Sequence, residues 1–243
     1  ISTTFWGFMF GSFFGDAVNV IATTFFNRPD IRLAPLWFEP VSLPMKLLVF
    51  AFGLGILHLF IGLGIKFYSC VKNGSLADGI YDAIFWYMLV GGGIVYLLTM
   101  SMFTEMLGLT FTLPAVAGTV AAYAAAIGFV GIVLTSGRES KNWVKRILKG
   151  LYGAYGVSSY LSDILSYSRL LALGLATSVI STVFNKMGSM MGASIPGAII
   201  FILVFVIGHS LNLAINALGA YVHTNRLQYV EFFGKFYEGG GRK

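Results

Sequence analysis

The sequence predicts an all-α integral membrane protein with about six transmembrane helices, of which the last two are long and strongly tilted. Hydrophobic residues make up 57% of the 243 residues, charged residues make up 11%, and the mean hydropathy is +0.81. This chain is more apolar than the core of a soluble protein requires. Apolar runs of about 18 or more residues recur along it, and each is long enough to cross a hydrocarbon layer of roughly 30 Å. Short segments of alternating hydrophobicity, typical of a β-barrel, are not seen.

The first four spans are expected to form a membrane scaffold over residues 1–136. Span one runs from about 3 to 26 and carries Gly7, Gly11 and Gly15 at intervals of four residues. On one helix this spacing predicts a ridge of small residues that a neighbouring helix can approach closely.

The next three spans follow a loop that contains four prolines. Residues 27–44 form this loop, which suits a membrane surface because proline breaks helices. Spans two, three and four are expected at about 45–71, 79–102 and 112–135. Span two contains His58, which we interpret as a packing group, and the alanine- and glycine-rich span four is expected to pack inside the bundle.

A basic segment, residues 137–149, separates the scaffold from the last two spans. With six spans, both ends of the chain lie on one side of the membrane. That side holds ten basic residues: Lys66, Lys72, Arg138, Lys141, Lys145, Arg146, Lys149, Lys235, Arg242 and Lys243. The other side holds four: Arg28, Arg32, Lys46 and Lys186. The positive-inside rule therefore predicts that both ends are cytoplasmic.

The last two spans, within residues 137–243, are longer than an upright crossing needs. The fifth runs from about 143 to 191 without a proline, and the sixth runs from Pro196 to about Tyr237. At 1.5 Å per residue each helix is far longer than the bilayer is thick. Each is therefore expected to tilt strongly or to break.

Both long spans carry a stripe of polar residues. At 100° per residue, one set on span five falls within roughly 80° of arc: Tyr155, Ser159, Ser162, Ser166, Arg169 and Thr177. A second set on span six falls within roughly 100°: His209, Asn212, Asn216, His223 and Arg226. Because unpaired polar groups in hydrocarbon are costly, each stripe is expected to line a wet cavity or a protein contact. The alternative is a hydrogen-bonded seam between the two helices, with the arginines paired to Asp163 and Glu231.

The two intramembrane arginines, Arg169 and Arg226, indicate a negatively charged partner. A central membrane arginine costs about 2.5–3.5 kcal/mol on insertion scales. Arginine keeps its proton, so it can hold or displace an anion but cannot relay a proton. The acidic residues Asp16, Asp163 and Glu231 are too few for both a conduction path and two permanent pairs. We therefore expect the partner on another chain, while Asp16 is open to either an ion path or a structural hydrogen bond.

Several function classes find no support in the sequence. It contains no P-loop, no H-E-x-x-H and no nucleophile elbow, so covalent catalysis is not indicated. No metal ligand set, bound cofactor or nucleic-acid interface is predicted. A secondary transporter that binds an anion at the arginines is the main alternative, although the inverted repeats of such transporters are not evident. A purely structural membrane anchor is a third hypothesis.

Two segments closely resemble one family. S-Y-S-R-L-L-A-L-G-L-A at 166–176 and G-H-S-L-N-L-A-I-N-A-L-G-A-Y-V-H-T-N-R-L-Q-Y-V-E-F-F-G-K-F-Y-E-G-G-G at 208–241 are similar to the membrane domain of subunit a of the vacuolar- and archaeal-type rotary ATPases, called subunit I in bacteria. G-S-F-F-G-D at 11–16 agrees more loosely. The family's domain has eight spans after a cytosolic half, so the resemblance implies that this chain corresponds to the last six.

The resemblance implies a noncatalytic stator that moves H⁺ or Na⁺ beside a rotating proteolipid ring. Arg169 matches the arginine that meets each ring carboxylate and separates two half-channels, and Arg226 matches the family's second arginine. The family's half-channel lining then maps onto the polar positions of both long spans: Tyr155, Ser159, Ser162, Asp163, Ser166, Thr177, His209, Asn212, Asn216, His223, Gln228 and Glu231.

The resemblance also implies partners and a location. The partners are the proteolipid ring (subunit c or K), the peripheral stalks through the cytosolic half, the central-stalk subunit d or C, the ATPase head and the lipid bilayer. The sequence R-L-L-A-L-G-L-A resembles bacterial members of the family, which implies a bacterial plasma membrane. Thr177 and Asn216 depart from the histidine and the acid of eukaryotic proton pumps, which leaves the choice between H⁺ and Na⁺ open.

Overall fold

The computed structural model describes residues 2–31, 33–109, 113–137 and 143–237, and within these ranges it contains helices and turns but no β-strand. Five helical segments are long and apolar enough to cross a membrane: Pro44–Lys72, Leu76–Thr99, Ala115–Thr135, Ile147–Ser189 and Ile195–Lys235. The prediction of an all-α integral membrane protein is confirmed. The chain forms two compact units. Unit 1 comprises residues 1–48 and 169–225, and unit 2 comprises residues 49–168 and 226–243.

The first predicted span is not one helix, so that prediction was wrong. It divides into α1 (Ser2–Phe10) and α2 (Ala17–Phe26). Gly11 and Gly15 between them have φ values of 62° and 73°, in the left-handed region that favours glycine. A Cβ on Gly11 would lie 2.7 Å from the Cα of Pro35. The glycine spacing therefore serves two sharp backbone turns and a close approach of the following loop, rather than a helical ridge.

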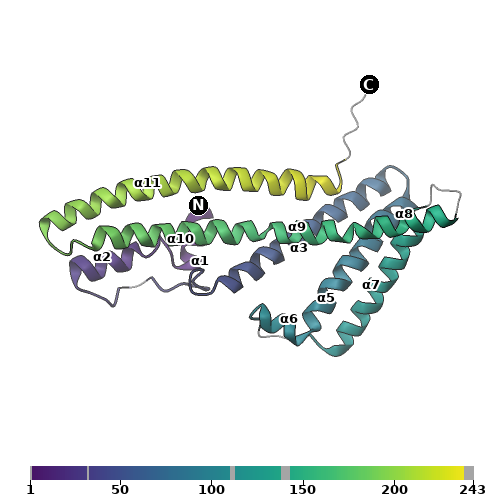
Figure 1. Ribbon diagram of the computed structural model, residues 1–243, viewed down its shortest axis with the longest axis horizontal. Coiled ribbons are helices and arrows are strands. Elements are labelled where there is room, and N and C mark those ends of the chain that lie inside the picture. The colour runs from purple at the N-terminus through teal and green to yellow at the C-terminus, as the bar shows by residue number, and fades with distance from the viewer. Residues whose placement is uncertain (1, 32, 110–112, 138–142, 238–243) are drawn as a thin grey trace, which may run out of the picture. The chain divides into compact units, whose positions relative to one another are not determined.

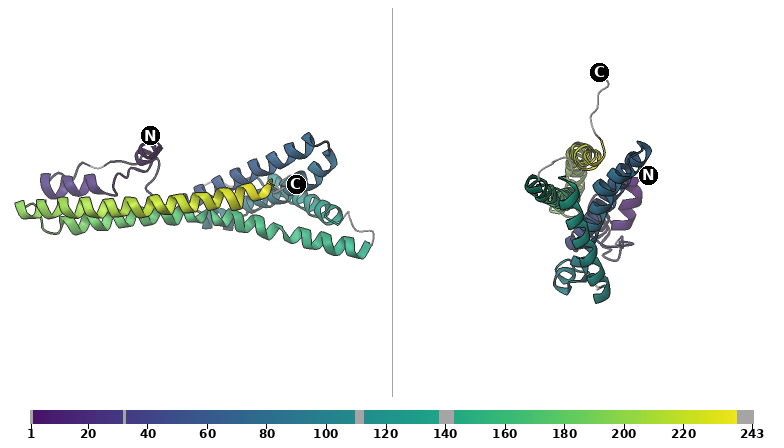
Figure 2. Two further views of the ribbon diagram at one scale, coloured as in Figure 1. Left: turned by 90° about the horizontal axis from the view of Figure 1, so that it is seen from above. Right: turned by 90° about the vertical axis from the view of Figure 1, so that its right-hand side faces the viewer.

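The long helices α10 (Ser168–Ser189) and α11 (Ile195–Arg226) dominate unit 1. Within this unit they run antiparallel and side by side (Figure 1), and the views in Figure 2 agree. Gly192 turns the chain with a φ of 70°. Ser194 then caps α11, because its Oγ accepts a hydrogen bond of 3.2 Å from the N–H of Gly197. Pro196 lies in the first turn of α11, where its missing N–H costs nothing.

Unit 2 contains helices whose positions match the predicted spans. The helix α3 (Pro44–Lys72) ends in this unit, and α7 (Ala115–Thr135) lies wholly within it. The third span consists of α4, two π-helical turns and α5: Leu76–Gly79, Ile80–Ile84, Tyr87–Gly91 and Gly92–Thr99. The short helix α6 (Ser101–Met106) follows it.

Glycine lets α7 approach the third span of unit 2 closely. A Cβ on Gly92 would lie 2.7 Å from the carbonyl oxygen of Ala121, and one on Gly128 would lie 2.7 Å from the backbone of Leu89. The helices α5 and α7 accordingly lie side by side. The buried residues of α7 are Gly118, Ala121, Gly128 and Ile132, so one face packs closely, and the expectation that the helix lies inside the bundle stays a prediction.

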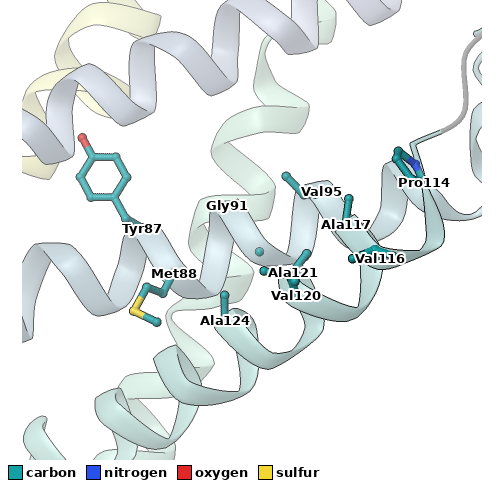
Figure 3. A pocket seen from close by; sticks show the side chains of 11 residues that line it. Tyr87, Met88, Gly91, Val95, Pro114, Val116, Ala117, Val120, Ala121 and Ala124 are labelled. Carbon is teal, nitrogen blue, oxygen red and sulfur yellow. The ribbon is translucent and has the colours of Figure 1, made fainter.

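A cavity of about 720 Å³ lies between the third span and α7 in unit 2. Figure 3 shows its lining, which is apolar apart from Tyr87. The hydroxyl of Tyr87 donates a hydrogen bond to the backbone carbonyl of Phe60 on α3. This cavity therefore offers hydrocarbon-like surface rather than a polar path.

The fifth span is a helical run with two local interruptions. It passes through α8 (Trp143–Tyr155), α9 (Val157–Ser166) and α10, with turns at Gly156 and Tyr167. The apolar runs of the last two spans contain 43 and 41 residues. Their predicted length is thus confirmed, and their tilt stays a prediction.

The predicted sidedness of the membrane also stays a prediction. Five of the basic residues used for it lie outside the described residues: Arg32, Arg138, Lys141, Arg242 and Lys243.

Candidate functional site

Six polar side chains join α10 to α11 inside unit 1, and we call them the amide seam: Thr177, Ser181, Asn185, His209, Asn212 and Asn216. The hydroxyl of Thr177 donates a hydrogen bond of 2.6 Å to Oδ1 of Asn216. Nδ2 of Asn212 donates to Oγ of Ser181 at 2.7 Å and to the backbone carbonyl of Thr177 at 3.2 Å. The seam is therefore a ladder of bonds between neutral amides and hydroxyls.

Asn185 extends the seam towards the break between α1 and α2. Its side chain is fully buried, and Nδ2 donates to the backbone carbonyl of Phe14 at 2.8 Å and to Oδ1 of Asp16 at 3.0 Å. The remaining atom, Oδ1, lies 2.8 Å from Nε2 of His209. Because Oδ1 can only accept, Nε2 of His209 must carry the hydrogen. Asp16 thus has the structural hydrogen bond that the sequence analysis held open.

A cavity of about 660 Å³ borders the seam within unit 1. One wall is formed by aromatic residues of the broken first segment, including Trp6 and Phe14. The polar residues of its lining include Ser178, Asn212 and Asn216. The lining thus combines apolar residues with amides and hydroxyls that are able to solvate a cation or hold water.

A second polar group lies in unit 2, and we call it the Asp163 cluster: His58, Tyr160, Asp163, Tyr167 and Lys235. Lys235 and Asp163 form an ion pair, and Nζ of Lys235 lies 4.0 Å from the ring centroid of Tyr160. Nδ1 of His58 lies 2.6 Å from the hydroxyl of Tyr167. His58 is therefore a packing group with a polar partner, Tyr167, in the turn after α9.

The acidic and basic residues of the last helix occupy different environments. Glu231 is 4% exposed in the π-helical turn η3 (Leu227–Phe232), while Gln228 of the same turn is exposed. Arg226 is exposed and His223 is half-buried. Turns of π-helix are frequent at functional sites because they change which residues share a face.

The remaining predicted residues divide along the fifth span. Arg169, in the first turn of α10, is half-buried, and so is Ser166. Tyr155, Ser159 and Ser162 are exposed on α8 and α9. The structure thus brings Thr177, His209, Asn212 and Asn216 together in unit 1.

Sequence reasoning missed five contributors to these two sites: Tyr160, Tyr167, Ser181, Asn185 and Lys235. Ser181 and Asn185 continue from Thr177 at intervals of four residues, a periodicity that could have extended the stripe. Lys235 was counted only as a topology charge, and its pairing with Asp163 joins segments 72 positions apart. Within the described ranges, no three His, Cys, Asp or Glu side chains approach closely enough to hold a metal ion.

Comparisons with known proteins give the family of this chain. The family model described as the V-type ATPase 116 kDa subunit family matches residues 157–243. The chain is 33% identical to the A-type ATP synthase subunit I of Methanocaldococcus jannaschii over 264 residues, covering 100% of this chain and 36% of that protein. It is 34% identical to the A-type ATP synthase subunit I of Pyrococcus horikoshii over 244 residues, covering 98% and 33%.

A bacterial relative matches over a shorter stretch. The V-type ATP synthase subunit I of Chlamydia pneumoniae is 27% identical over 162 residues, covering 67% of this chain and 23% of that protein. The chain spans about one third of the length of the first two relatives. The matched region of the family model includes α9, α10 and α11, which carry both arginines. The chain belongs to the V-type ATPase 116 kDa subunit family, whose relatives here are named as subunit I.

Proposed function

We propose that this chain forms the ion-translocating part of the stator of a rotary ATPase and has no catalytic role of its own. One observation carries the proposal: α10, the helix with Arg169, also lines a cavity in unit 1 with hydroxyl groups, to which α11 adds neutral amides. Polar groups at membrane depth are tolerated where they line a wet cavity or a protein contact. The relatives are named A-type ATP synthase subunit I, which supports a rotary ATPase as the complex.

In the proposed mechanism, Arg169 meets the essential carboxylate of each proteolipid ring subunit in turn. A carboxylate that crosses a low-dielectric surface needs a charge partner, and a fixed guanidinium offers it at one point. The carboxylate then releases its H⁺ or Na⁺ into one half-channel and is reloaded from the other. Moving one elementary charge across 100 mV is worth roughly 2.3 kcal/mol, so a leak past Arg169 would dissipate the coupling.

The two polar sites fit the two half-channels of this mechanism. The amide seam follows Arg169 along α10, and the Asp163 cluster precedes it along α9. We assign the seam and its cavity to one half-channel and the region of Asp163 and Glu231 to the other. Tyr155, Ser159, Ser162, Ser166, His223 and Gln228 are assigned to the lining as well, and Arg226 supports Arg169 as the second arginine.

The proposal extends to the surroundings of the chain. Its partners are the proteolipid ring, the peripheral and central stalks, the ATPase head and the bilayer, in a bacterial plasma membrane with both ends cytoplasmic. Residues 1–136 act as scaffold and residues 137–243 as the ion path. No bound cofactor is proposed, since H⁺ or Na⁺ is the cargo.

The test is Arg169→Ala in the complete complex, reconstituted in liposomes and assayed for ATP-driven ion uptake. We expect uptake to be abolished, because the ring carboxylate loses its charge partner. Arg28→Ala is the matched control, since Arg28 is exposed in the loop after α2 and should transport normally. Wild-type uptake by Arg169→Ala would refute the proposal.

A secondary transporter is a second candidate because the first segment is a broken helix, as in many transporters. The transporter hypothesis predicts substrate-dependent uptake by liposomes that contain this chain without the ATPase head. Uptake only in the presence of the head and ATP would exclude it.

A further inference from the structure

Lys235 lies near the end of the last helical segment, in a 3₁₀ turn from Phe233 to Lys235 that follows the π-helical turn η3. Its side chain is 11% exposed, and that of its partner Asp163 is 16% exposed. Both charges are therefore largely removed from solvent. A pair in that position is stable only while both members are present, because removing one leaves an uncompensated buried charge.

The surroundings fix the ammonium of Lys235 on several sides. Asp163 pairs with it, and the ring of Tyr160 lies 4.0 Å below it as a cation–π partner. Tyr160 is itself stacked on Trp86 with ring centroids 4.5 Å apart. On α3, Gly62 faces the stem of Lys235, since a Cβ added to Gly62 would lie 3.5 Å from Cβ of Lys235, in ordinary van der Waals contact.

Other ionisable groups surround this pair from three directions. Glu231 on η3 interacts electrostatically with Asp163 and with Tyr167. Asp82, from the first π-helical turn of the third span, interacts electrostatically with Tyr160. On α3, His58 is hydrogen-bonded to Tyr167. Lys235 thus neutralises one carboxylate in a region where other acidic groups are near.

We propose that Lys235 is a positioning residue that holds Asp163 as a permanent anion, so that Asp163 shapes the ion path without itself carrying the transported ion. This inference rests on the proposed function. A cation that enters this region has to compete with a tethered ammonium for Asp163, and the tether gives the lysine a high effective concentration. The transported ion therefore passes Asp163 without being carried by it, and other groups of the ion path carry the ion.

The test compares four variants in the complete complex, with ATP-driven ion uptake as the readout: Lys235→Gln, Asp163→Asn, the double variant, and Lys235→Arg. Each single neutralisation leaves an unpaired charge, so we expect uptake to fall at least about tenfold. The double variant removes both charges and should transport at least about fivefold faster than either single variant. Lys235→Arg keeps the pair and should also transport.

A pH profile separates this role from a merely structural one. Lys235→Gln should regain uptake relative to wild type as the pH falls, because protonation neutralises the unpaired Asp163. The double variant lacks that carboxylate and should follow the wild-type profile. An unchanged profile for Lys235→Gln would contradict the proposal.

The double variant gives the decisive outcome. If it is as inactive as Asp163→Asn, then Asp163 carries the ion and the proposal is overturned. If Asp163→Asn alone transports normally, the pair is unimportant and the proposal also fails. Should Lys235→Gln not assemble, the comparison of the double variant with Asp163→Asn still decides. Arg169→Ala in the same preparation tests the proposed function separately. Normal ion uptake by that variant would refute the stator function but would not bear on the role of the Lys235–Asp163 pair.

Discussion

In unit 1, α10 and α11 meet through amide and hydroxyl side chains, whereas in unit 2 the third span and α7 meet through glycine. Asn212, for example, donates to Ser181 and to the backbone of Thr177, while Gly92 lies directly against the backbone of Ala121. The same chain therefore packs helices closely without polar side chains. Packing alone does not require the amide seam, and this difference favours a role in contact with water or an ion.

Asn185→Leu should have the largest effect on stability, because it removes hydrogen bonds of the amide seam in unit 1. The leucine leaves the Phe14 carbonyl, the Asp16 carboxylate and the His209 ring each without a bond that they have now. Since each buried unsatisfied group costs about 1–3 kcal/mol, we expect a loss of about 3 kcal/mol or more. Thermal unfolding of the purified complex in detergent measures it.

The control for Asn185→Leu is Met187→Leu, an apolar replacement on the same helix. Met187 is 53% exposed, so its replacement should leave the unfolding temperature unchanged. Equal unfolding temperatures for both variants would show that the seam does not hold α10 to α11 and to the first segment.

Gly92→Ala tests the glycine contact between the third span and α7 in unit 2. Its effect on stability should be smaller. A methyl group there meets the carbonyl of Ala121 at 2.7 Å, and overpacking of this kind costs about 1–3 kcal/mol. The neighbouring Gly93 has nothing within 4 Å of its would-be Cβ. Gly93→Ala should therefore be neutral, or stabilising by up to about 1 kcal/mol. Similar melting curves for the two variants would contradict the glycine contact.

The Thr177–Asn216 bond should show the smallest effect on stability. A double-mutant cycle with Thr177→Val and Asn216→Leu should give a coupling energy of about 0.6 kcal/mol, the average for such bonds between membrane helices. If the seam lines an ion path, ATP-driven uptake should fall by more than this energy accounts for. Thr182→Val is the control, because the Thr182 hydroxyl donates its hydrogen bond within α10, to the carbonyl of Ser178. An equal loss of ion uptake in Thr182→Val would indicate that the substitutions act through α10 in general and not through the seam.

The sequence predicted best those features that follow from composition and helical period. The helix α3 begins at Pro44 and ends at Lys72, within one residue of the expected span, because an apolar run between a proline-rich loop and a glycine turn has clear limits. The stripe at Thr177, His209, Asn212 and Asn216 also comes together. A helix that carries polar residues on one face must place that face against something polar.

The errors arise where a local pattern has two physical meanings. Gly11 and Gly15 have the spacing of a helical ridge, but glycine is equally suited to positive φ, and here the backbone turns prevail. Lys235 near a chain end suits a topology charge, yet the π-helical and 3₁₀ turns place it against Asp163. Such tertiary pairings are not encoded in the period of a single helix. The roles of the site residues in transport stay predictions.

The most direct test of the central claim asks whether the cavity beside the amide seam is wet in the intact complex. In a Cys70→Ser background, cysteine is placed at Ser178, which lines the cavity, or at Val179, which does not. A charged, membrane-impermeant thiol reagent is then added from each side of the membrane. We expect Ser178→Cys to react from one side only, with inhibition of ion uptake, while Val179→Cys stays unmodified. Absence of reaction at Ser178→Cys from either side would contradict an ion path along the seam.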